Sequence, residues 1–401
     1  MLRILADANI PHAAEAFGRY GAVRTLPGRA ITPDALAEAD VLLVRSVTPV
    51  SPEVLEGTHV RFVASATAGT DHVAVGPLAE AGIAFAHAPG SNAASVVDWA
   101  LAALLTLAAE RGEALEGRTL GVVGVGEVGG RLVPRARALG MRVLACDPPR
   151  QRRGAAGDWR PLAEVLAQSD IVTLHTPLTR GGADATHHLI GEAELAAMRP
   201  GAWLVNAARG PVVDGDALLR AVTGGRLGAV ALDVWEGEPV PNPGLGARVD
   251  LGTPHVAGYA LDGKIRGTAM VERALRAWLV ASGEAAPDAL PPTWDTQTAL
   301  APPAPLVVDA PDLPTHTPEA RAAWLHALAR QAYSVRADDA RFRRAVVGMP
   351  DPERRGAAFA ELRRTYPVRR EWSRYRVRGE VPGPLAPSVR EGLGMTPEAA
   401  P

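Results

Sequence analysis

The chain has 401 residues, more than one hydrophobic core usually serves, so its length predicts two or three domains. Hydrophobic residues make up 47% of it and charged residues 21%, as in globular proteins. The formal net charge of −2 excludes a global field that attracts nucleic acid or an anionic membrane. The single cysteine, Cys146, rules out an internal disulfide and favours a reducing, cytoplasmic location.

The first part of the chain, up to about residue 92, alternates short apolar runs with helix-like segments. Strands are expected at Leu2–Leu5, Val41–Val44, Phe62–Ala66 and Ile83–Ala86, and helices at Pro11–Tyr20 and Pro33–Ala39. This alternation predicts a parallel sheet with crossover helices. The first strand lacks the apolar region of a signal peptide.

A long apolar helix is expected next, over Ser95–Glu110. Its longest uncharged stretch, Trp99–Ala109, is shorter than a membrane span. We therefore interpret this helix as buried in the protein and expect no membrane partner.

A second alternating series begins at Arg118. Its strands are expected at Thr119–Val123, Met141–Ala145, Ile171–Leu174, Ala202–Val205, Leu227–Leu232 and Val249–Leu251, and its helices at Glu127–Leu139, Pro161–Ala167 and Gly191–Met198. The predicted fold class is therefore α/β, with two doubly wound parallel-sheet domains of the Rossmann or flavodoxin type around a cleft.

The segment Tyr259–Ser282 reads as one helix that returns to the first domain. The first domain would then comprise residues 1–93 plus 259–284, and the second would comprise residues 94–258. Two crossings of the chain between these domains would form a hinge around the cleft.

The chain after residue 285 changes in composition. The proline-rich stretch 286–318 predicts a linker or an extended wrapping segment. Helical patterns at Pro318–Tyr333 and Pro352–Tyr366, separated by Arg-rich turns, indicate a small α/β domain over 285–380. Residues 381–401 have no apolar pattern and are interpreted as a flexible tail.

Three polar motifs follow three of the strands expected in the second domain. They contain Arg209 in Asn206–Gly210, Glu238 in Glu236–Pro239, and His255 in Gly252–His255. If the strands are neighbours in one parallel sheet, their carboxyl ends meet at one edge, where open α/β sheets bind ligands.

The three side chains suit the oxidation of an alcohol that carries an acid group. Arg209 would hold a carboxylate, with Gly210 letting it approach the ligand closely. His255 would take the hydroxyl proton, and Glu238 would fix its tautomer. Taken singly, Arg209 also fits an interdomain salt bridge and Glu238 an exposed loop charge.

A glycine motif, Gly124-Val125-Gly126-Glu127-Val128-Gly129, lies between an expected strand and an expected helix. Gly124 permits the turn, Gly126 lets a pyrophosphate approach, and Gly129 lets the helix pack on the strand. Asp147 follows at the end of the next strand, where a carboxylate binds the adenosine ribose.

NAD is the predicted cofactor, because a carboxylate at residue 147 repels the 2′-phosphate of NADP. Three arginines just downstream leave the NADP alternative open, although a solvated basic loop explains them as well: Arg150, Arg152 and Arg153.

No metal site is predicted. His187 and His188 are followed by Glu192, but a helix that begins at Gly191 would place them on different faces. In the first domain, Ser46 and Thr67 lie in loops that follow strands, where hydroxyls can receive carboxylate or phosphate oxygens. Turn formation explains these two residues equally well.

In chain order, these motifs resemble the D-2-hydroxyacid dehydrogenases. The motifs are GVGEVG, Asp147, NAARG, DVWEGEP and GTPHVAGY. Further stretches, among them LLVRSVT, ATAGTDHV, PGSNAASVV and the late Arg370-Glu371-Trp372, resemble a subgroup with a C-terminal appendage. The resemblance covers residues 1 to about 375.

The resemblance implies roles for individual residues. Arg209, Glu238 and His255 would be catalytic, and Ser46, Thr67 and Tyr259 would bind the substrate. NAD would contact the glycine motif and the following residues: Asp147, Thr176, Ala207, Ala208, Arg209, Asp233 and Gly258.

The resemblance also implies a substrate and a partner. The subgroup oxidises a phosphorylated 2-hydroxy acid, 4-phospho-D-erythronate, with NAD in pyridoxal phosphate biosynthesis, and its appendage forms a homodimer. The alternatives are a dehydrogenase acting on 3-phosphoglycerate, hydroxypyruvate or glyoxylate, and a non-catalytic regulator that senses NADH.

Overall fold

The computed structural model describes residues 1–398, and its contacts divide the chain into two compact units. The first unit comprises Met1–Asn92 and Tyr259–Pro303, and the second comprises Ala93–Gly258 and the chain from Ala304 onward. The chain therefore passes between the units more than once. The C-terminal segment groups with the second unit, so the division into three domains stays a prediction.

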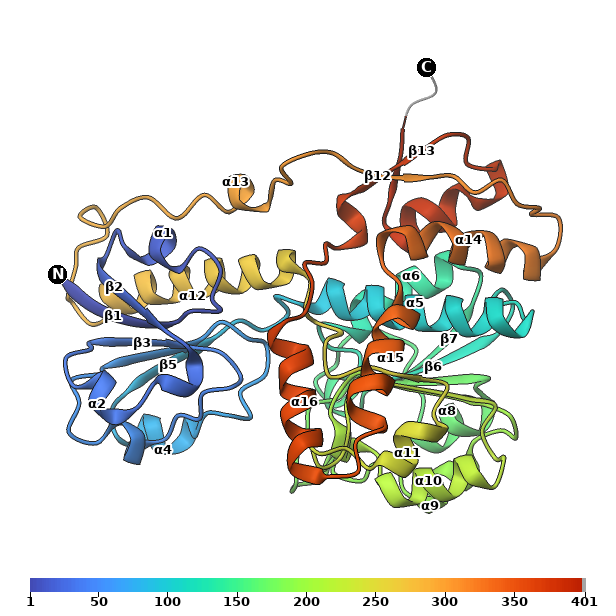
Figure 1. Cartoon of the computed structure of the whole chain (residues 1–401), viewed down its shortest axis with the longest axis horizontal. Coiled ribbons are helices and arrows are strands. Elements are labelled where there is room, and N and C mark those ends of the chain that lie inside the picture. Colours follow the sequence, from blue (N-terminus) through green and yellow to red (C-terminus); the bar gives the residue numbers. More distant parts are fainter. Residues whose placement is uncertain (399–401) are drawn as a thin grey trace. The chain divides into compact units, whose positions relative to one another are not determined.

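The first unit is built on a parallel sheet with the strand order β2-β1-β3-β4-β5. Its strands are β1 (Leu2–Asp7), β2 (Gly21–Leu26), β3 (Val41–Val44), β4 (Phe62–Ser65) and β5 (Ala84–His87). Its helices are α1 (Ala13–Phe17), α2 (Pro33–Leu36), α3 (Pro52–Leu55), α4 (Val75–Glu80), α12 (Leu261–Ala281) and α13 (Thr296–Leu300). Helices cover both faces of this sheet (Figure 1).

The sequence did not predict β2, because this edge strand is largely exposed and carries few apolar residues. α12 packs on the face beside β4 and β5 through buried Val271, Leu275 and Leu279. The proline-rich segment continues along this unit, where Arg19 Nη1 donates to Pro292 O at 2.6 Å.

The second unit contains a parallel sheet with the order β11-β10-β9-β8-β6-β7. Its strands are β6 (Thr119–Val123), β7 (Arg142–Cys146), β8 (Ile171–Leu174), β9 (Trp203–Asn206), β10 (Ala229–Leu232) and β11 (Leu251–Gly252). The direction of winding reverses at β6, so the space beyond the ends of β6 and β8 is the topological switch point, where such sheets bind ligands.

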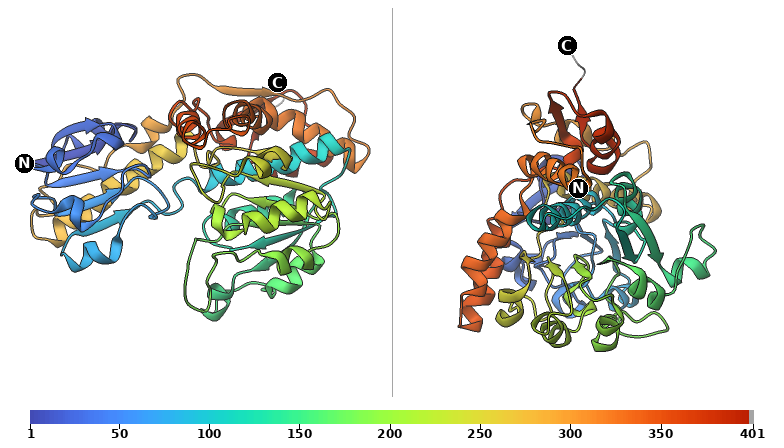
Figure 2. Two further views of the ribbon diagram at one scale, coloured as in Figure 1. Left: turned by 60° about the horizontal axis from the view of Figure 1, so that its bottom comes forward. Right: turned by 90° about the vertical axis from the view of Figure 1, so that its right-hand side faces the viewer.

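Helices lie on both faces of this six-stranded sheet, as Figure 2 shows. They are α5 (Ala93–Arg111), α6 (Gly129–Ala138), α7 (Pro148–Arg152), α8 (Leu162–Gln168), α9 (Glu192–Ala197), α10 (Gly215–Thr223) and α11 (Pro243–Arg248). The predicted α/β class with parallel sheets is confirmed.

α5 is the long apolar helix that the sequence predicted, and it is buried along nearly its whole length. By length and composition it is the one helix among residues 1–398 that could cross a membrane, yet 83% of that stretch is buried inside the protein. α5 is therefore the core helix of the second unit.

The C-terminal segment adds helices and a small parallel sheet to the second unit. Its elements are β12 (Leu306–Asp309), α14 (Pro318–Ala332), α15 (Val335–Phe342), η3 (Arg343–Val347), α16 (Pro352–Arg364), β13 (Tyr375–Arg378), η6 (Ser388–Leu393) and β14 (Thr396–Pro397). The Arg-rich stretch predicted as turns is the helix α15 and its continuation η3. The sequence did not predict this helix because charged residues dominate it, and its buried apolar residues are only Val335 and Phe342 at its two ends.

The prediction of a flexible tail over 381–401 is wrong for residues 381–398, and residues 399–401 lie outside the described chain. The segment is held by apolar contacts and by Arg135, whose Nε donates to Gly392 O at 2.7 Å and Nη2 to Leu393 O at 2.8 Å. Its buried apolar side chains are Leu385, Val389, Leu393 and Met395. Intervening prolines and glycines obscured their spacing in the sequence.

Candidate active site

The three polar motifs follow three neighbouring parallel strands, as predicted. β10 pairs with β9 on one side and with β11 on the other, and Leu232 is in register with both Asn206 and Gly252. The loops that carry Arg209, Glu238 and His255 therefore leave the sheet side by side at its carboxyl edge.

His255 and Glu238 form a hydrogen-bonded pair. His255 Nδ1 lies 2.7 Å from Glu238 Oε2, and Trp235 N donates to the other carboxylate oxygen at 2.7 Å. Burial by itself would raise the pKa of Glu238, but the charge of His255 and the hydrogen bonds from His255 and Trp235 outweigh it, so this pKa is lowered. Glu238 is thus ionised, which directs the Nδ1 proton toward it.

The backbone of His255 has a φ of 57°, in the left-handed region that few residues other than glycine adopt. Asp233, which is 1% exposed, holds this turn. Its carboxylate accepts hydrogen bonds from Thr253 Oγ1 at 2.6 Å, Val256 N at 2.8 Å and Ala257 N at 2.9 Å. Burial raises the pKa of Asp233, opposed by His255 and these donors.

Arg209 lies in a turn that the buried Asn206 holds. The Asn206 amide donates to Arg209 O at 3.0 Å and accepts from Ala208 N at 3.0 Å, and Arg209 Nη1 donates to Ala208 O at 2.8 Å. No role for Asn206 was expected from the sequence. A buried amide side chain at the end of a strand is the signal that would have found it.

Gly210 has a different purpose from the one the sequence suggested. A Cβ at this position would lie 2.0 Å from Trp235 C and 2.4 Å from Glu236 N. Glycine is therefore required because the Arg209 turn packs directly on the backbone of the loop that leads to Glu238. This contact brings the loops of Arg209 and Glu238 together.

The glycine motif connects β6 to α6 and occupies the switch point. Gly124 has a φ of 86°, and a Cβ on Gly129 would lie 2.1 Å from Gly124 O, so the turn and the close helix packing both require glycine. A Cβ on Gly126 would meet no atom of the protein within 4 Å. Gly126 thus faces open space, which fits the approach of a pyrophosphate.

Asp147 joins the glycine motif to the start of α7. Its carboxylate accepts from Val125 N at 2.8 Å and from Arg150 N at 3.0 Å. Arg150 Nη1 in turn donates to Val125 O at 2.7 Å, and Arg152 pairs with Asp184. Both arginines thus have partners in the protein, while residues 151–154 of this loop are exposed.

The loop after β8 adds two polar atoms at the switch point that find no hydrogen-bond partner among residues 1–398. They are the buried Thr176 Oγ1 and His175 Nδ1. The backbone of His175 lies against Gly124, at 2.8 Å from the position of a Cβ there. Burial lowers the pKa of His175 to about 4, so its imidazole is neutral. Thr176 fits the predicted cofactor site, whereas His175 was not expected there from the sequence.

The other residues predicted to contact NAD lie at the same edge of the sheet. Ala207 and Ala208 follow β9, Asp233 follows β10, and Gly258 ends the His255 turn. Because Asp233 already accepts three hydrogen bonds from that turn, its clearest contribution is to hold His255.

The predicted substrate residues belong to the first unit. Ser46 is exposed after β3, and Thr67 follows the adjacent strand β4, where its hydroxyl bonds Ser65 Oγ at 2.6 Å and Gly69 O at 2.9 Å. Tyr259 lies beneath Lys264, whose Nζ is 4.7 Å from the ring centre. Arg45 donates to Asn9 O at 2.9 Å.

One group of side chains in the described part of the chain has the spacing of metal ligands. Atoms of His187, His188 and Glu236 lie within 4.8 Å of one another. Glu236, rather than Glu192, is the carboxylate that lies near the histidines. Within this group, His188 Nε2 lies 2.6 Å from Glu236 Oε1.

Comparison with known proteins agrees with this geometry. The family model described as the NAD binding domain of D-isomer specific 2-hydroxyacid dehydrogenases matches residues 97–257, and a domain of unknown function matches residues 310–386. A D-lactate dehydrogenase from Aquifex aeolicus, complexed with NAD and lactic acid, is 25% identical with a TM-score of 0.60, over 70% of this chain and 96% of that one.

The curated relatives are closer and match nearly the full length. Erythronate-4-phosphate dehydrogenase from Salinibacter ruber is 52% identical over 98% of both chains. The enzyme of that name from Azotobacter vinelandii is 46% identical over 99% of this chain and 100% of its own.

The fold, the glycine motif and the His–Glu pair thus define an NAD-dependent dehydrogenase of the D-isomer specific 2-hydroxyacid class. The similarity over the whole length, including the C-terminal segment, narrows this class. The chain belongs to the erythronate-4-phosphate dehydrogenase family.

Proposed function

We propose that this protein oxidises 4-phospho-D-erythronate to (R)-3-hydroxy-2-oxo-4-phosphooxybutanoate with NAD, in the biosynthesis of pyridoxal 5′-phosphate. The observation that carries the chemistry is the His255–Glu238 pair, and the full-length similarity to erythronate-4-phosphate dehydrogenases supports the substrate. In this reaction the C2 hydroxyl loses a proton, the C2–H bond gives up a hydride, and a carbonyl forms at C2.

His255 is the proposed base for the hydroxyl proton. With Glu238 ionised, Nδ1 of the neutral imidazole keeps its proton and donates to Oε2, so Nε2 presents the lone pair that accepts the substrate proton. The imidazolium that forms is stabilised by the adjacent carboxylate. NAD, when bound, supplies the acceptor for the hydride that leaves C2.

Arg209 is the proposed clamp for the substrate carboxylate and the C2 oxygen. A guanidinium binds a carboxylate through two parallel hydrogen bonds and stabilises negative charge on the carbonyl oxygen. The Asn206 turn and the packing of Gly210 on residues 235–236 fix the position of Arg209 relative to the Glu238 loop.

We assign NAD contacts to Gly124, Gly126 and Gly129 for the pyrophosphate, and to Asp147 for the adenosine ribose. Thr176 would donate to the cofactor with a hydroxyl that has no partner among the described residues. The remaining assigned contacts are Ala207, Ala208, Arg209, Asp233 and Gly258.

Residues of the first unit are assigned to the substrate. Ser46, Thr67 and Tyr259 would bind its polar groups, and Arg45 would contact the phosphate. We also propose that the protein is cytoplasmic and forms a homodimer through its C-terminal segment. The single buried cysteine and the family resemblance support these two assignments.

The function is tested by incubating the purified chain with NAD and either 4-phospho-D-erythronate or 3-phosphoglycerate while following NADH formation. Turnover of the first substrate alone is expected. In a separate assay that supplies NADH and follows its consumption, reduction of glyoxylate or hydroxypyruvate would identify a different dehydrogenase. Protein that binds NADH and turns over none of these substrates would support the regulator and refute the enzyme.

The role of His255 is tested with His255→Ala. We expect this variant to lose turnover, by at least about 100-fold, and to bind NADH like the parent protein. NADH affinity is read from the fluorescence of the bound cofactor. Undiminished turnover would show that another group takes the proton.

A further inference from the structure

The strand that leads to His255, β11, is the edge strand of the six-stranded sheet. On its inner side it pairs with β10, where Thr253 N donates to Leu232 O at 2.9 Å. On its outer side, Gly252 N donates to Asp339 Oδ1 at 2.8 Å instead of to another strand. The helix α15 of the C-terminal segment thus satisfies the open edge of the sheet.

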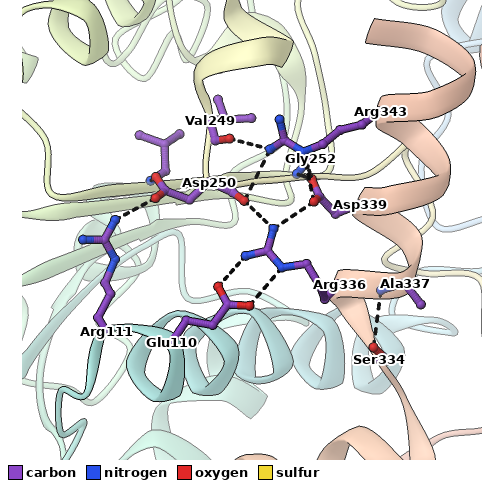
Figure 3. A network of polar contacts seen from close by, with 11 residues as sticks. Glu110, Arg111, Val249, Asp250, Gly252, Ser334, Arg336, Ala337, Asp339 and Arg343 are labelled. Atoms are coloured by element: carbon purple, nitrogen blue, oxygen red, sulfur yellow. Dashed lines mark hydrogen bonds and ion pairs between the residues drawn. The ribbon is translucent and has the colours of Figure 1, made fainter. Parts of the chain in front are cut away.

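Two arginines hold Asp339 in place, as Figure 3 shows. The Asp339 side chain is only 3% exposed; its Oδ2 accepts from Arg336 Nη1 at 2.8 Å, and Arg343 Nε lies 2.9 Å from Oδ1. Arg336 also donates to Asp250 O at 2.8 Å, and Arg343 donates to Val249 O. The chain just before the His255 turn is therefore bonded at successive residues.

A third arginine of the C-terminal segment holds the chain just after His255. The buried Arg369 donates to Ala257 O, and its guanidinium lies 4.1 Å from the ring centre of Tyr333. Tyr333 in turn donates to Asp338 Oδ2 at 2.9 Å. Arg369 is thus fixed within its own segment while it reaches the His255 turn.

The loop of Glu238 rests on the same segment. A Cβ on Gly356, in α16, would lie 3.1 Å from Val240 Cγ2 and 3.6 Å from Pro239 Cγ. α16 therefore packs against the residues that follow Glu238. α15 and Arg369 contact the chain before and after His255.

We propose that Asp339 and Arg369 are positioning residues for the reaction, because they fix the two ends of the turn that carries His255. They keep the left-handed backbone of His255 and its hydrogen bond to Glu238 in place, and the C-terminal segment thereby takes part in catalysis. The expected effect on kcat rests on the proposed function. The expected effect on the rigidity of the turn is independent of that function.

The kinetic test compares Arg369→Met with Arg369→Lys and Asp339→Asn. Methionine keeps the apolar contact with Tyr333 but cannot donate to Ala257 O, whereas lysine can. We expect Arg369→Met to lower kcat at least about tenfold, with the KM for NAD unchanged, and Arg369→Lys to recover part of the loss. The solvent deuterium isotope effect on kcat should rise, because a displaced His255 makes proton transfer slower. A merely structural role would reduce the active fraction and leave this isotope effect unchanged.

The second test needs no substrate. Hydrogen exchange followed by mass spectrometry should show faster exchange in the peptide over residues 249–258 for Arg369→Met and Asp339→Asn, by at least about tenfold. Exchange over β6 should not change. The matched control is Arg378→Gln, which breaks an exposed ion pair with Asp309 inside the C-terminal sheet and should alter neither readout.

The outcomes separate the two proposals. If the wild type does not turn over 4-phospho-D-erythronate, the proposed function fails, and the exchange data still decide whether Asp339 and Arg369 hold the turn. Unchanged exchange over residues 249–258 in both Arg369→Met and Asp339→Asn overturns the positioning proposal. If the wild type is active, a kcat of Arg369→Met equal to that of the wild type overturns it as well. If Arg369→Met does not fold, Arg369→Lys and Asp339→Asn provide the same comparison.

Discussion

At His255 the backbone and the side chain are held by different groups. Asp233 fixes the left-handed turn from inside the sheet, and Glu238 fixes the imidazole from a neighbouring loop. A residue in the left-handed region stores strain that the surrounding structure must support. At the scale of single residues, this support favours the proposed role of His255 as a base.

Replacement of Glu238 by glutamine tests the pair. The glutamine amide is neutral and cannot stabilise the imidazolium, so we expect kcat to fall at least about 100-fold while NADH still binds. NADH formation and fluorescence titration give the two quantities. Glu236→Gln is the control in the same loop, since Glu236 bonds His188 and Gly215 N. A kcat for Glu238→Gln close to that of the control would contradict the assigned role.

The lowered pKa of Glu238 also affects stability. A carboxyl whose pKa is lower in the folded than in the unfolded protein stabilises the fold above its unfolded pKa. This stabilisation is lost as the pH falls through the folded pKa. Glu238→Gln should therefore flatten the acid side of the curve of unfolding free energy against pH, in urea titrations of both proteins.

The buried His175 predicts a pH dependence in a different range. Its pKa is lowered from 6.5 to about 4, so the unfolded chain takes up a proton in this range while the folded protein does not. The free energy of unfolding should therefore fall as the pH falls from 6.5 to 4, by up to about 3 kcal/mol from this residue.

His175→Gln, which can keep the hydrogen bond to Thr173, should remove this part of the slope. Urea denaturation across the same pH range measures it, with the exposed His59→Gln as the control. Equal slopes for the wild type and His175→Gln would show that His175 does not titrate in this way.

Loops rather than strands decide the geometry at the scale of elements. β9, β10 and β11 are short, but their register places three loops at one edge, and Gly210 lets two of these loops touch. Gly126, in the glycine motif after β6, differs from Gly210, because a Cβ at residue 126 would meet no protein atom within 4 Å. Packing of the protein therefore requires glycine at residue 210, whereas glycine at residue 126 is explained by the proposed contact with NAD.

The pair Gly210→Ala and Gly126→Ala separates these reasons. Alanine at residue 210 must displace the backbone at residues 235–236, so we expect a loss of about 1–3 kcal/mol in stability together with lower kcat. Alanine at residue 126 meets no protein atom and should leave stability nearly unchanged while weakening NAD binding. Thermal unfolding and NADH titration distinguish the two. Normal NAD affinity in Gly126→Ala would remove residue 126 from the cofactor site.

At the scale of the whole molecule, the C-terminal segment from Ala304 onward groups with the second unit. α14 packs along α5, Trp372 is buried in the same core, and Ser95 donates to Glu371 at 2.8 Å. This packing joins the segment to the core helix of the second unit and, through Asp339 and Arg369, to the turn of His255.

Deletion of residues 381–401 tests how far this integration extends. The deletion removes four buried apolar side chains and exposes the core surface that they cover. Burial of each such side chain contributes about 1.5–3 kcal/mol to stability. We expect a Tm lower by several degrees and binding of a hydrophobic dye at ambient temperature. Calorimetry and dye fluorescence provide the measurements. A Tm equal to that of the full chain would restore the interpretation of this segment as a loose tail.

The sequence by itself determined the parallel sheets, the buried helix α5, the glycine motif and the places of Arg209, Glu238 and His255 after neighbouring strands. These follow from local periodicity and from motifs at the ends of strands, which need only neighbouring residues to recognise. The catalytic roles of Arg209, Glu238 and His255 stay predictions. The sequence did not predict β2 and α15, because exposed or charged residues separate their apolar residues. It also did not predict the packing of Leu385, Val389, Leu393 and Met395, because prolines and glycines lie between them.

Only the tertiary structure decided that Gly210 serves a contact between loops, and that Asp339 and Arg369 hold the two ends of the His255 turn. The hydrogen bond from Gly252 N to Asp339 joins residues 87 positions apart, and the one from Arg369 to Ala257 O joins residues 112 apart. Local periodicity does not predict such contacts, because they depend on how elements distant in the sequence pack together. The candidate site residues thus lie in short sequence motifs, whereas the contacts that position them form only when the chain folds.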